Sequence, residues 1–256
     1  VIKVVTGVRR CGKSTLFTLY IDWLKKSGVS SDQIILVNLE DLEFYDLWEH
    51  RDMYTYIKEH LRPGSSNYVF IDEIQNCKNF EKAVDSLFMK PGVDVYITGS
   101  NAFMLSGELA TLLSGRYIAI DMLPFSFREY CQSPVTRGKS RQECFNEYLR
   151  FGSFPYAAQL PRQNTDVLPY LEGIYHTILI KDVAKRENIN DISVLESIVK
   201  TLASSMGSPI SAKKIADTLC SAGRKISVNT VERYLRALTD SYLFYEISRY
   251  DIKGRQ

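Results

Sequence analysis

The chain has 256 residues, 45% of them hydrophobic, so its length suits one or two domains with a large core. Its formal net charge of +2 excludes a strong overall attraction to nucleic acid or membrane and leaves only local ones. The sequence shows no signal peptide and no apolar run long enough to span a membrane. Its five cysteines form no C-x-x-C pair and its three histidines are scattered, which favours reduced thiols, a cytoplasmic location and no histidine-based metal site.

A β-branched run, a glycine loop and a helix-like stretch open the chain. Residues 1–6 are predicted to form a buried strand, and residues 15–26 carry apolar side chains at helical spacing. Between them, residues 7–14 (GVRRCGKS) fit the P-loop pattern G-x-x-x-x-G-K-[ST] at every fixed position. This context predicts a phosphate site, because the glycines expose backbone N–H groups and the helix N-terminus is partly positive. The alternative is a glycine-rich turn that fits the pattern by chance.

We expect the loop to bind a nucleotide together with its Mg²⁺. Lys13 is expected to reach the β- and γ-phosphates, and the Ser14 hydroxyl is expected to ligate the metal. Cys11 lies among backbone N–H donors and beside two arginines, so we expect a lowered thiol pKa and high reactivity. The residues predicted to contact the nucleotide are Gly7, Val8, Arg9, Arg10, Cys11, Gly12, Lys13, Ser14 and Thr15.

Residues 67–73 (NYVFIDE) run from a buried strand directly into two carboxylates. Ligands of open α/β sheets bind at the carboxyl ends of the strands, which is where these acids are expected. We expect Asp72 to hold the Mg²⁺ and Glu73 to polarise the attacking water as a general base. An acidic turn after a strand is a common alternative, but the P-loop upstream favours the functional interpretation.

Further strands are expected over 33–39, 94–102 and 117–122, and helices over 45–61 and 79–89. Ser100 and Asn101 lie in the small polar end of the second of these strands and are candidates for sensing a γ-phosphate or, equally, for an ordinary capped turn. Arg116 begins the last strand after a glycine, where a guanidinium group is expected to reach a γ-phosphate in its own or a neighbouring chain. The alternative is a solvated arginine at a strand start.

From residue 123 the α/β pattern gives way to helices, which are expected over 141–150, 167–185 and 192–206. The turn FGSFP at 151–155 separates the first two. Such a turn either lines an adenine pocket or simply joins two helices, and the residues alone favour the joining role.

Residues 211–247 are predicted to form a winged helix-turn-helix. A helix over 211–219, a turn over 221–226 and a helix over 227–238 precede a strand-like alternation at 243–247. Residues 211–236 carry six basic and two acidic side chains, a local net charge of +4. This charge is typical either of a DNA-contacting surface or of a protein-docking face. The residues assigned to DNA contact are Lys213, Lys214, Asn229, Thr230, Arg233 and Arg236.

Taken together, these motifs resemble a group of prokaryotic AAA-type P-loop ATPases related to the signal-transducing STAND branch. The double arginine at 9–10 and the run LPFSFREY at 123–130 are the most specific parts, and the resemblance covers essentially the whole chain. In that group a restriction-nuclease-like domain follows the winged helix, and here it would begin beyond Gln256. The residues to which the resemblance assigns roles are Lys13, Ser14, Asp72 and Glu73 in ATP-Mg²⁺ binding and hydrolysis, Arg116 as a finger and Pro155 near the base.

The expected fold class is therefore α/β, with a parallel-sheet P-loop NTPase core, a helical lid-like segment and a winged helix-turn-helix. The expected domains are 1–122, 123–190 and 191–256, in a chain that we expect to be a piece of a longer protein because it starts inside a strand without methionine. The leading hypothesis is an ATPase whose hydrolysis of ATP drives its helical and winged-helix parts. The alternative is a nucleotide-switched module that binds DNA or protein with little hydrolysis. A homo-oligomer is compatible with both, and no membrane partner is expected.

Overall fold

The computed structural model describes residues 1–100, 113, 115–160, 164–185, 187–189 and 191–248. It divides into two compact units, Val1–Leu171 and Glu172–Gln256, and the boundary falls inside helix α7 (Asn164–Thr177). The sequence suggested boundaries after residues 122 and 190 instead, and that three-part division stays a prediction.

Within the described residues, five parallel strands form one sheet in the order β2-β3-β4-β1-β5. Their bounds are Ile2–Thr6 (β1), Ile34–Asn38 (β2), Asn67–Asp72 (β3), Val93–Gly99 (β4) and Tyr117–Asp121 (β5). The strands predicted within residues 1–122 are thus confirmed. Because all pairings are parallel, the loops that follow β1, β2, β3 and β4 leave the sheet at the same edge.

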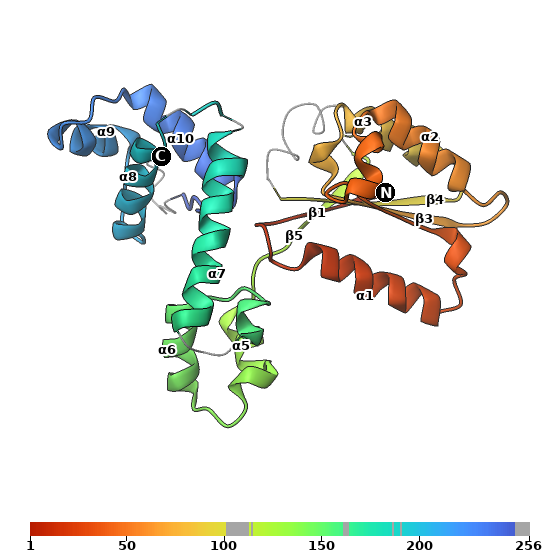
Figure 1. Ribbon diagram of the computed structural model, residues 1–256, viewed down its shortest axis with the longest axis horizontal. Helices are drawn as coiled ribbons and strands as arrows, with labels where there is room; N and C mark the ends of the chain where they lie inside the picture. The colour runs from red at the N-terminus through yellow and green to blue at the C-terminus, as the bar shows by residue number, and fades with distance from the viewer. Residues whose placement is uncertain (101–112, 114, 161–163, 186, 190, 249–256) are drawn as a thin grey trace, which may run out of the picture. The chain divides into compact units, whose positions relative to one another are not determined.

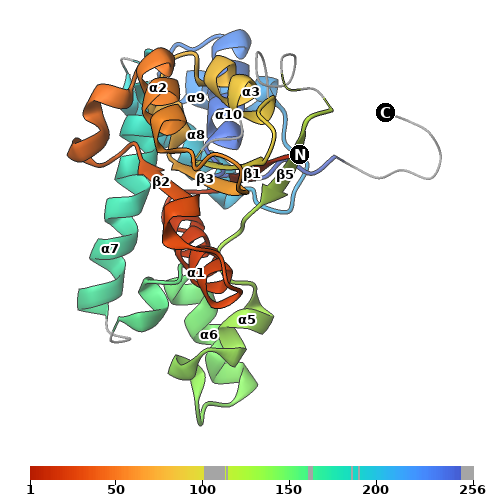
Figure 2. The ribbon, with the colours of Figure 1, turned by 90° about the vertical axis from the view of Figure 1, so that its right-hand side faces the viewer.

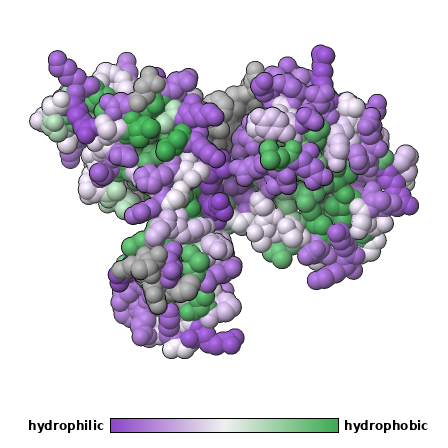
Figure 3. All heavy atoms as spheres, viewed as in Figure 1, coloured by the Kyte–Doolittle hydropathy of each residue, from purple (hydrophilic) through white to green (hydrophobic). Residues whose placement is uncertain are grey.

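Helices cover both faces of this sheet (Figures 1 and 2). Helix α1 (Lys13–Lys26) lies on one face, and α2 (His50–His60) and α3 (Phe80–Phe88) lie on the other. Figure 3 shows hydrophobic residues gathered between α1 and the sheet. The buried residues of that contact are Phe17, Ile21 and Leu24 of α1 and Val5, Phe70 and Tyr96 of the sheet. A sheet that is covered on both faces has strands with nearly continuous apolar runs, which is why the sequence pattern identified them.

The helix predicted over 45–61 is wrong at its start. The chain forms a 3₁₀ helix at Leu42–Leu47, and α2 begins only after Glu49. Trp48 Nε1 donates to the Leu39 carbonyl oxygen at 3.1 Å, which holds this segment near the end of β2. Glu49 then has an extended backbone (φ −102°, ψ 135°), so the α-helix starts anew after it. Shorter 3₁₀ turns lie at Ser31–Gln33 before β2 and at Ile74–Asn76 after β3.

Two helices follow the sheet and lie side by side in both ribbon views (Figures 1 and 2), namely α5 (Phe127–Gln132) and α6 (Arg141–Phe151). Each begins with a reciprocal capping box, which explains where it starts. The box residues are Ser126 with Glu129 and Ser140 with Glu143. After α6, the 3₁₀ turn Ala157–Gln159 and the start of α7 share a small apolar cluster with Phe151.

The second unit is helical. A π-helical stretch, Ile178–Ala184, continues α7. The helices described after it are Ile192–Ser204 (α8), Ala212–Ser221 (α9) and Val228–Asp240 (α10). Ser211 and Ser227 cap α9 and α10, which pack against each other, so the predicted helix pair is confirmed. The strand predicted at 243–247 is wrong, because this segment is a turn followed by irregular chain. None of the described helices is long and apolar enough to cross a membrane.

Candidate active site

The glycine loop after β1 is shaped by backbone conformations that favour glycine. Gly7 and Gly12 have φ angles of 150° and 110°, and Arg10 between them also has a positive φ of 66°. A Cβ atom on Gly7 would come within 2.1 Å of the Met122 carbonyl oxygen, so a side chain there would force the chain after β5 to move. The loop ends at Lys13, the first residue of α1.

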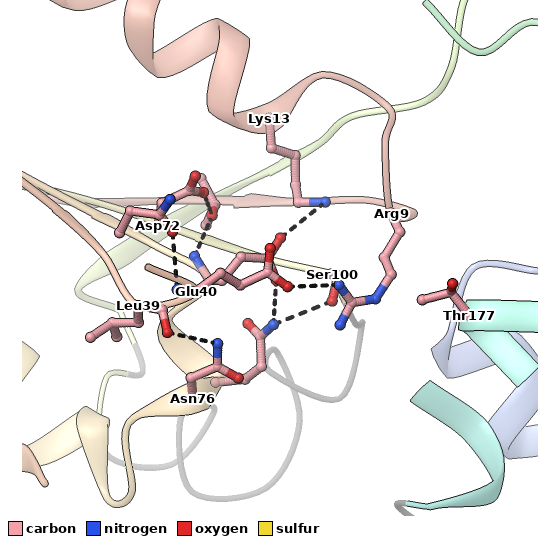
Figure 4. A network of polar contacts seen from close by, with 12 residues as sticks. Arg9, Lys13, Leu39, Glu40, Asp72, Asn76, Ser100 and Thr177 are labelled. Atoms are coloured by element: carbon pink, nitrogen blue, oxygen red, sulfur yellow. Dashed lines mark hydrogen bonds and ion pairs between the residues drawn. The ribbon is translucent and has the colours of Figure 1, made fainter. Parts of the chain in front are cut away.

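The Lys13 ammonium group lies inside the loop rather than in solvent, and its side chain is 3% exposed. Its Nζ donates to the carbonyl oxygens of Gly7 (2.9 Å) and Val8 (3.1 Å) and lies 4.0 Å from Glu73 Oε1. A buried charge requires such partners, because burying it alone is costly. Lys13 therefore links the glycine loop to the residue that follows β3 (Figure 4).

The first turn of α1 has the features of an anion-binding site. Its N-cap residue is Gly12, which offers no side chain to cap the helix, and no acidic residue lies in the first turn. Ser14 and Thr15 of that turn are exposed. The unsatisfied N–H groups and the partial positive charge of such a helix end favour a phosphate group.

Asp72 and Glu73 lie together at the carboxyl end of β3 and are only 5% and 7% exposed. The Thr98 hydroxyl on the neighbouring strand β4 donates to Asp72 Oδ1 and accepts from the Glu73 N–H at 3.0 Å. One hydroxyl group therefore fixes both acidic residues. The sequence analysis missed Thr98, although a hydroxyl residue near the end of the apolar strand VDVYITG was a usable signal.

Glu73 has a left-handed backbone conformation (φ 52°, ψ 49°), which is uncommon for a residue other than glycine. Burial raises the pKa of its carboxyl group, while the Lys13 charge and a hydrogen bond from Gln75 act in the opposite direction. A raised pKa suits a general base, because proton transfer is most effective when the pKa lies near the working pH.

Ser100, one of the two predicted sensor residues, is linked to Glu73 by hydrogen bonds through Gln75. It is 2% exposed, and its Oγ accepts a hydrogen bond from Gln75 Nε2 at 3.3 Å. The same Gln75 nitrogen donates to Glu73 Oε2. The sequence analysis did not identify Gln75, and the other predicted sensor, Asn101, lies outside the described residues.

Arg9 of the double arginine forms an ion pair at the site. Arg9 Nη1 lies 2.9 Å from Oε1 of Glu40, which follows β2 (Figure 4). The Arg10 side chain is exposed. Side chains from the loops after β1, β2, β3 and β4 thus meet at one edge of the sheet, as its parallel topology requires.

The lowered thiol pKa expected for Cys11 is wrong. The residue is 1% exposed, and burial raises its pKa more strongly than Lys13 and the backbone N–H groups lower it. Its Sγ would lie 3.1 Å from a Cβ atom placed on Gly7, so the thiol packs against the loop from the inside.

The turn at 151–155 lies against the glycine loop. A Cβ atom on Gly12 would have Pro155 Cγ at 3.9 Å and Met122 Cε at 3.2 Å. The Ser153 carbonyl accepts a hydrogen bond of 2.9 Å from Phe125 N–H, which ties the turn to the LPFSFREY run. Pro155 therefore lies beside the start of α1, whereas its contact with a base stays a prediction.

Arg116 lies at the amino ends of the strands, whereas the glycine loop lies at their carboxyl ends. It precedes β5, whose first residue Tyr117 pairs with Ile2 at the start of β1, whereas the glycine loop follows the end of β1. Its guanidinium group pairs with Asp85 of α3 and lies over the Phe88 ring. A strand of this length spans roughly 16 Å, which argues against a contact with phosphates on the loop of its own chain. Action in a neighbouring chain stays a prediction.

In the second unit, most residues assigned to DNA contact are exposed on α9 and α10. These are Lys213, Lys214, Asn229, Arg233 and Arg236. Thr230 differs, because its N–H donates to the Ser227 hydroxyl and the two hydroxyl groups lie 2.8 Å apart. Thr230 therefore belongs to the helix cap as well as to this surface.

The oxygen donors of the site fit Mg²⁺. The magnesium ion of a nucleotide is usually held by one or two protein oxygens together with phosphates and water. The Ser14 hydroxyl lies in the first turn of α1, and the Asp72 carboxylate is already oriented by Thr98. When bound, Mg²⁺ would neutralise part of the charge on the phosphates.

A parallel sheet with a glycine loop after β1 and two buried acids after β3 defines a core of the P-loop NTPase type. Residues 1–131, just over half of the chain, match the AAA domain family, and this chain belongs to that family. Residues 142–256 match a domain of unknown function (DUF8612). The predicted resemblance is thus confirmed at the level of the AAA family, whereas the STAND-related branch and the nuclease-like group stay predictions.

Two relatives align with almost the whole chain. An uncharacterized protein of Haemophilus influenzae is 37% identical over 99% of this chain and 64% of its own length. An uncharacterized protein of Methanocaldococcus jannaschii is 30% identical over 99% of this chain and 58% of its own. The chain therefore spans about three fifths of the length of these relatives.

Among solved structures, AMPPCP-bound DnaA of Aquifex aeolicus has a TM-score of 0.40 and 14% identity. The similarity covers 94% of this chain and 82% of DnaA. It is too low to support an inference about function.

Proposed function

We propose that this chain binds and hydrolyses ATP-Mg²⁺. The observation that carries the proposal is the position of Lys13, a buried cation that contacts the loop carbonyls and lies 4.0 Å from the Glu73 carboxylate. Its Nζ would exchange carbonyl partners for the β- and γ-phosphate oxygens. Membership of the AAA family supports a nucleotide as the ligand.

Each residue of the site has a distinct task in this proposal. The N–H groups of the loop and of the first turn of α1 hold the phosphates, and Ser14 and Asp72 hold Mg²⁺. Glu73 accepts a proton from the attacking water, for which its raised pKa is suitable. Ser100 is proposed to sense the γ-phosphate, since its buried hydroxyl lies in the same network.

A hydrolysis assay combined with calorimetric ATP titration tests the proposal. Lys13→Ala should weaken ATP binding by at least about tenfold, because it removes the buried cation of the loop. Glu73→Gln should retain ATP while turnover falls by about 10² to 10⁴-fold, the usual contribution of a general base. Lys25→Ala, at the exposed far end of the same helix, is the matched control. Unchanged ATP affinity in Lys13→Ala would mean that the loop is not a phosphate site.

We further propose that hydrolysis drives movement of the helical segment and of the second unit. The position of Pro155 supports this, because its Cγ would lie 3.9 Å from a Cβ atom on Gly12 and a nucleotide at the loop would therefore lie near the helical segment. In the alternative, ATP occupancy alone sets the affinity for a DNA or protein partner. Glu73→Gln distinguishes the two: trapping of ATP with loss of output supports hydrolysis-driven movement, and output like that of the wild type supports the switch.

Binding of DNA by α9 and α10 is a second candidate output. The exposed basic residues of these helices favour it, and a protein-docking face is the alternative. Replacing Lys213 and Lys214 by alanine should flatten the dependence of log affinity on log salt concentration by up to about two units, one for each lost phosphate contact. Replacing Arg233 should instead weaken sequence preference.

The control for this titration is Lys200→Ala, an exposed lysine of α8 outside the basic surface. Absence of duplex binding at low salt, with ATP and without it, would leave α9 and α10 as a structural or protein-docking module.

A further inference from the structure

Gln75 connects two residues of the candidate site that lie at the ends of different strands. It belongs to the 3₁₀ turn after β3. Its Nε2 donates to Glu73 Oε2 and, at 3.3 Å, to Ser100 Oγ beyond the end of β4. The proposed base and the proposed sensor therefore share one hydrogen-bond donor.

The oxygen atom of the Gln75 carboxamide is in an unfavourable environment. This atom, Oε1, is buried and has no hydrogen-bond partner among the described residues. An unsatisfied buried acceptor destabilises a fold, so the conformation does not serve the stability of the turn alone. The orientation that places Nε2 between Glu73 and Ser100 is instead the one that serves the two partners.

Two contacts among the described residues orient the Glu73 carboxylate. Lys13 Nζ lies on the side of Oε1, and Gln75 holds Oε2. Lys13 is also the group expected to move toward phosphate when nucleotide binds. Gln75 would then be the contact that keeps the carboxylate in place.

We infer that Gln75 is a positioning residue that couples the γ-phosphate sensor Ser100 to the base Glu73. A serine hydroxyl accepts a hydrogen bond while it donates its own proton. Ser100 can therefore accept from Gln75 and at the same time donate to a phosphate oxygen, which gives one chain of hydrogen bonds from phosphate to carboxylate. Such chains reinforce one another, so a γ-phosphate bound at Ser100 would strengthen the Gln75 contact that already orients Glu73. This inference rests on the proposed function.

The test compares kcat with ATP affinity in Gln75→Leu. Loss of positioning should lower kcat by roughly tenfold or more while the dissociation constant for ATP changes by less than about twofold, because Gln75 acts on the base and not on the bound nucleotide. Asn76→Ala is the matched control: Asn76 lies in the same turn and bonds the Leu39 carbonyl at 3.1 Å, outside the network of Glu73. Its kcat should stay near that of the wild type.

A double-mutant cycle tests the coupling itself. If Ser100 acts through Gln75, the variant carrying both Ser100→Ala and Gln75→Leu should have a kcat close to that of the less active single variant. Independent, multiplicative losses would overturn the coupling. Gln75→Glu keeps the shape of the side chain but replaces the donor by an acceptor, so it should lose kcat at least as strongly and serves if Gln75→Leu does not fold.

Failure of the inference can be told apart from failure of the proposed function. If the wild type hydrolyses ATP, Lys13→Ala loses binding and Gln75→Leu keeps full kcat, only the role of Gln75 is refuted. If the wild type neither binds nor hydrolyses ATP, the proposed function falls and the role of Gln75 falls with it.

Discussion

Glu73 carries several features that are unfavourable for an ordinary glutamate. Its backbone is left-handed, its side chain is buried, and burial raises its pKa. A left-handed conformation in a non-glycine residue costs on the order of 1 kcal/mol and persists only where neighbours enforce it. Thr98 holds its N–H and Gln75 holds its carboxylate. The neighbouring residues therefore keep Glu73 in this conformation at the expense of stability.

Glu73→Gln should stabilise the nucleotide-free protein at neutral pH, by about 1 kcal/mol, because it removes a charge whose burial is unfavourable and leaves the backbone conformation unchanged. A carboxyl group whose folded-state pKa is raised stabilises the fold below its unfolded pKa, and this stabilisation is lost as the pH rises through the folded pKa. The advantage of the uncharged variant should therefore be small in acid and grow toward neutral pH. Urea denaturation at several pH values, with EDTA present, measures it.

An advantage that is equal at all pH values would show that the charge of Glu73 does not matter. Asp32→Asn is the matched control, because that exposed carboxylate pairs with Arg62 and its pKa is lowered by hydrogen bonding with Ser30 and by Arg62. Its replacement should have the opposite sign, with a small loss of stability at neutral pH.

Cys11 should react slowly with alkylating reagents, since its thiol is buried and its pKa is raised. The exposed Cys220 provides an internal comparison within the same sample. Labelling at mildly alkaline pH, followed by mass spectrometry of the peptides, should show Cys11 reacting at least about tenfold more slowly than Cys220. Equal rates in the folded protein would contradict the burial of Cys11 inside the loop.

At the scale of elements, Pro155 of the turn at 151–155 lies near Gly12 at the start of α1. If Pro155 also contacts the base, Pro155→Ala should weaken ATP binding by roughly five- to tenfold, in keeping with the loss of one or two buried methylene groups. Inorganic tripolyphosphate has no base, so its affinity should not change. Both titrations use Pro134→Ala as the control, since Pro134 starts a separate 3₁₀ turn. An unchanged ATP affinity would leave the turn as a connection between helices.

The elements that were predictable from the sequence are those whose pattern is local. Strands buried on both faces have continuous apolar runs, and the P-loop pattern includes the residues that shape it. The helix expected from residue 45 was misplaced because the Trp48 bond to Leu39 is a contact between segments. The strand expected at 243–247 was wrong because alternation of side chains needs a partner strand to become a sheet.

The candidate site was predictable in its motif residues but not in their connections. Thr98 and Gln75 act across neighbouring strands, so their contacts with Asp72, Glu73 and Ser100 depend on register. Cys11 was misjudged because the loop turns its side chain inward, and sequence spacing does not contain that direction. Arg116 was correctly predicted to precede the last strand. Which end of the strands it lies at depends on the parallel pairing of β5 with β1, which the sequence does not contain.

At the scale of the whole molecule, the prediction that Arg116 acts as a finger in a neighbouring chain implies a site shared between chains. A finger from a neighbouring chain stabilises charge in the transition state, so Arg116→Ala should lower kcat by about 10³-fold or more while ATP binding changes little. Turnover per chain should rise with protein concentration. Mixing Arg116→Ala with Glu73→Gln chains should restore part of the activity, because each supplies the residue that the other lacks.

Arg62→Ala is the control for this experiment, since Arg62 also precedes a strand and pairs with an acid, Asp32, on the surface. It should leave turnover unchanged. Turnover that does not depend on concentration, together with no recovery on mixing, would refute the role of Arg116 in a neighbouring chain.

The start of α1, which no side chain caps, bears on how fast proteases degrade the protein. A phosphate group at this helix end would take the place of the missing cap, so a bound nucleotide would also stabilise the fold. A ligand present at a hundred times its dissociation constant adds about 2.7 kcal/mol to the free energy of unfolding. In a starved cell that contribution shrinks, and the chain would open more often to proteases. Its abundance would then fall together with the supply of ATP.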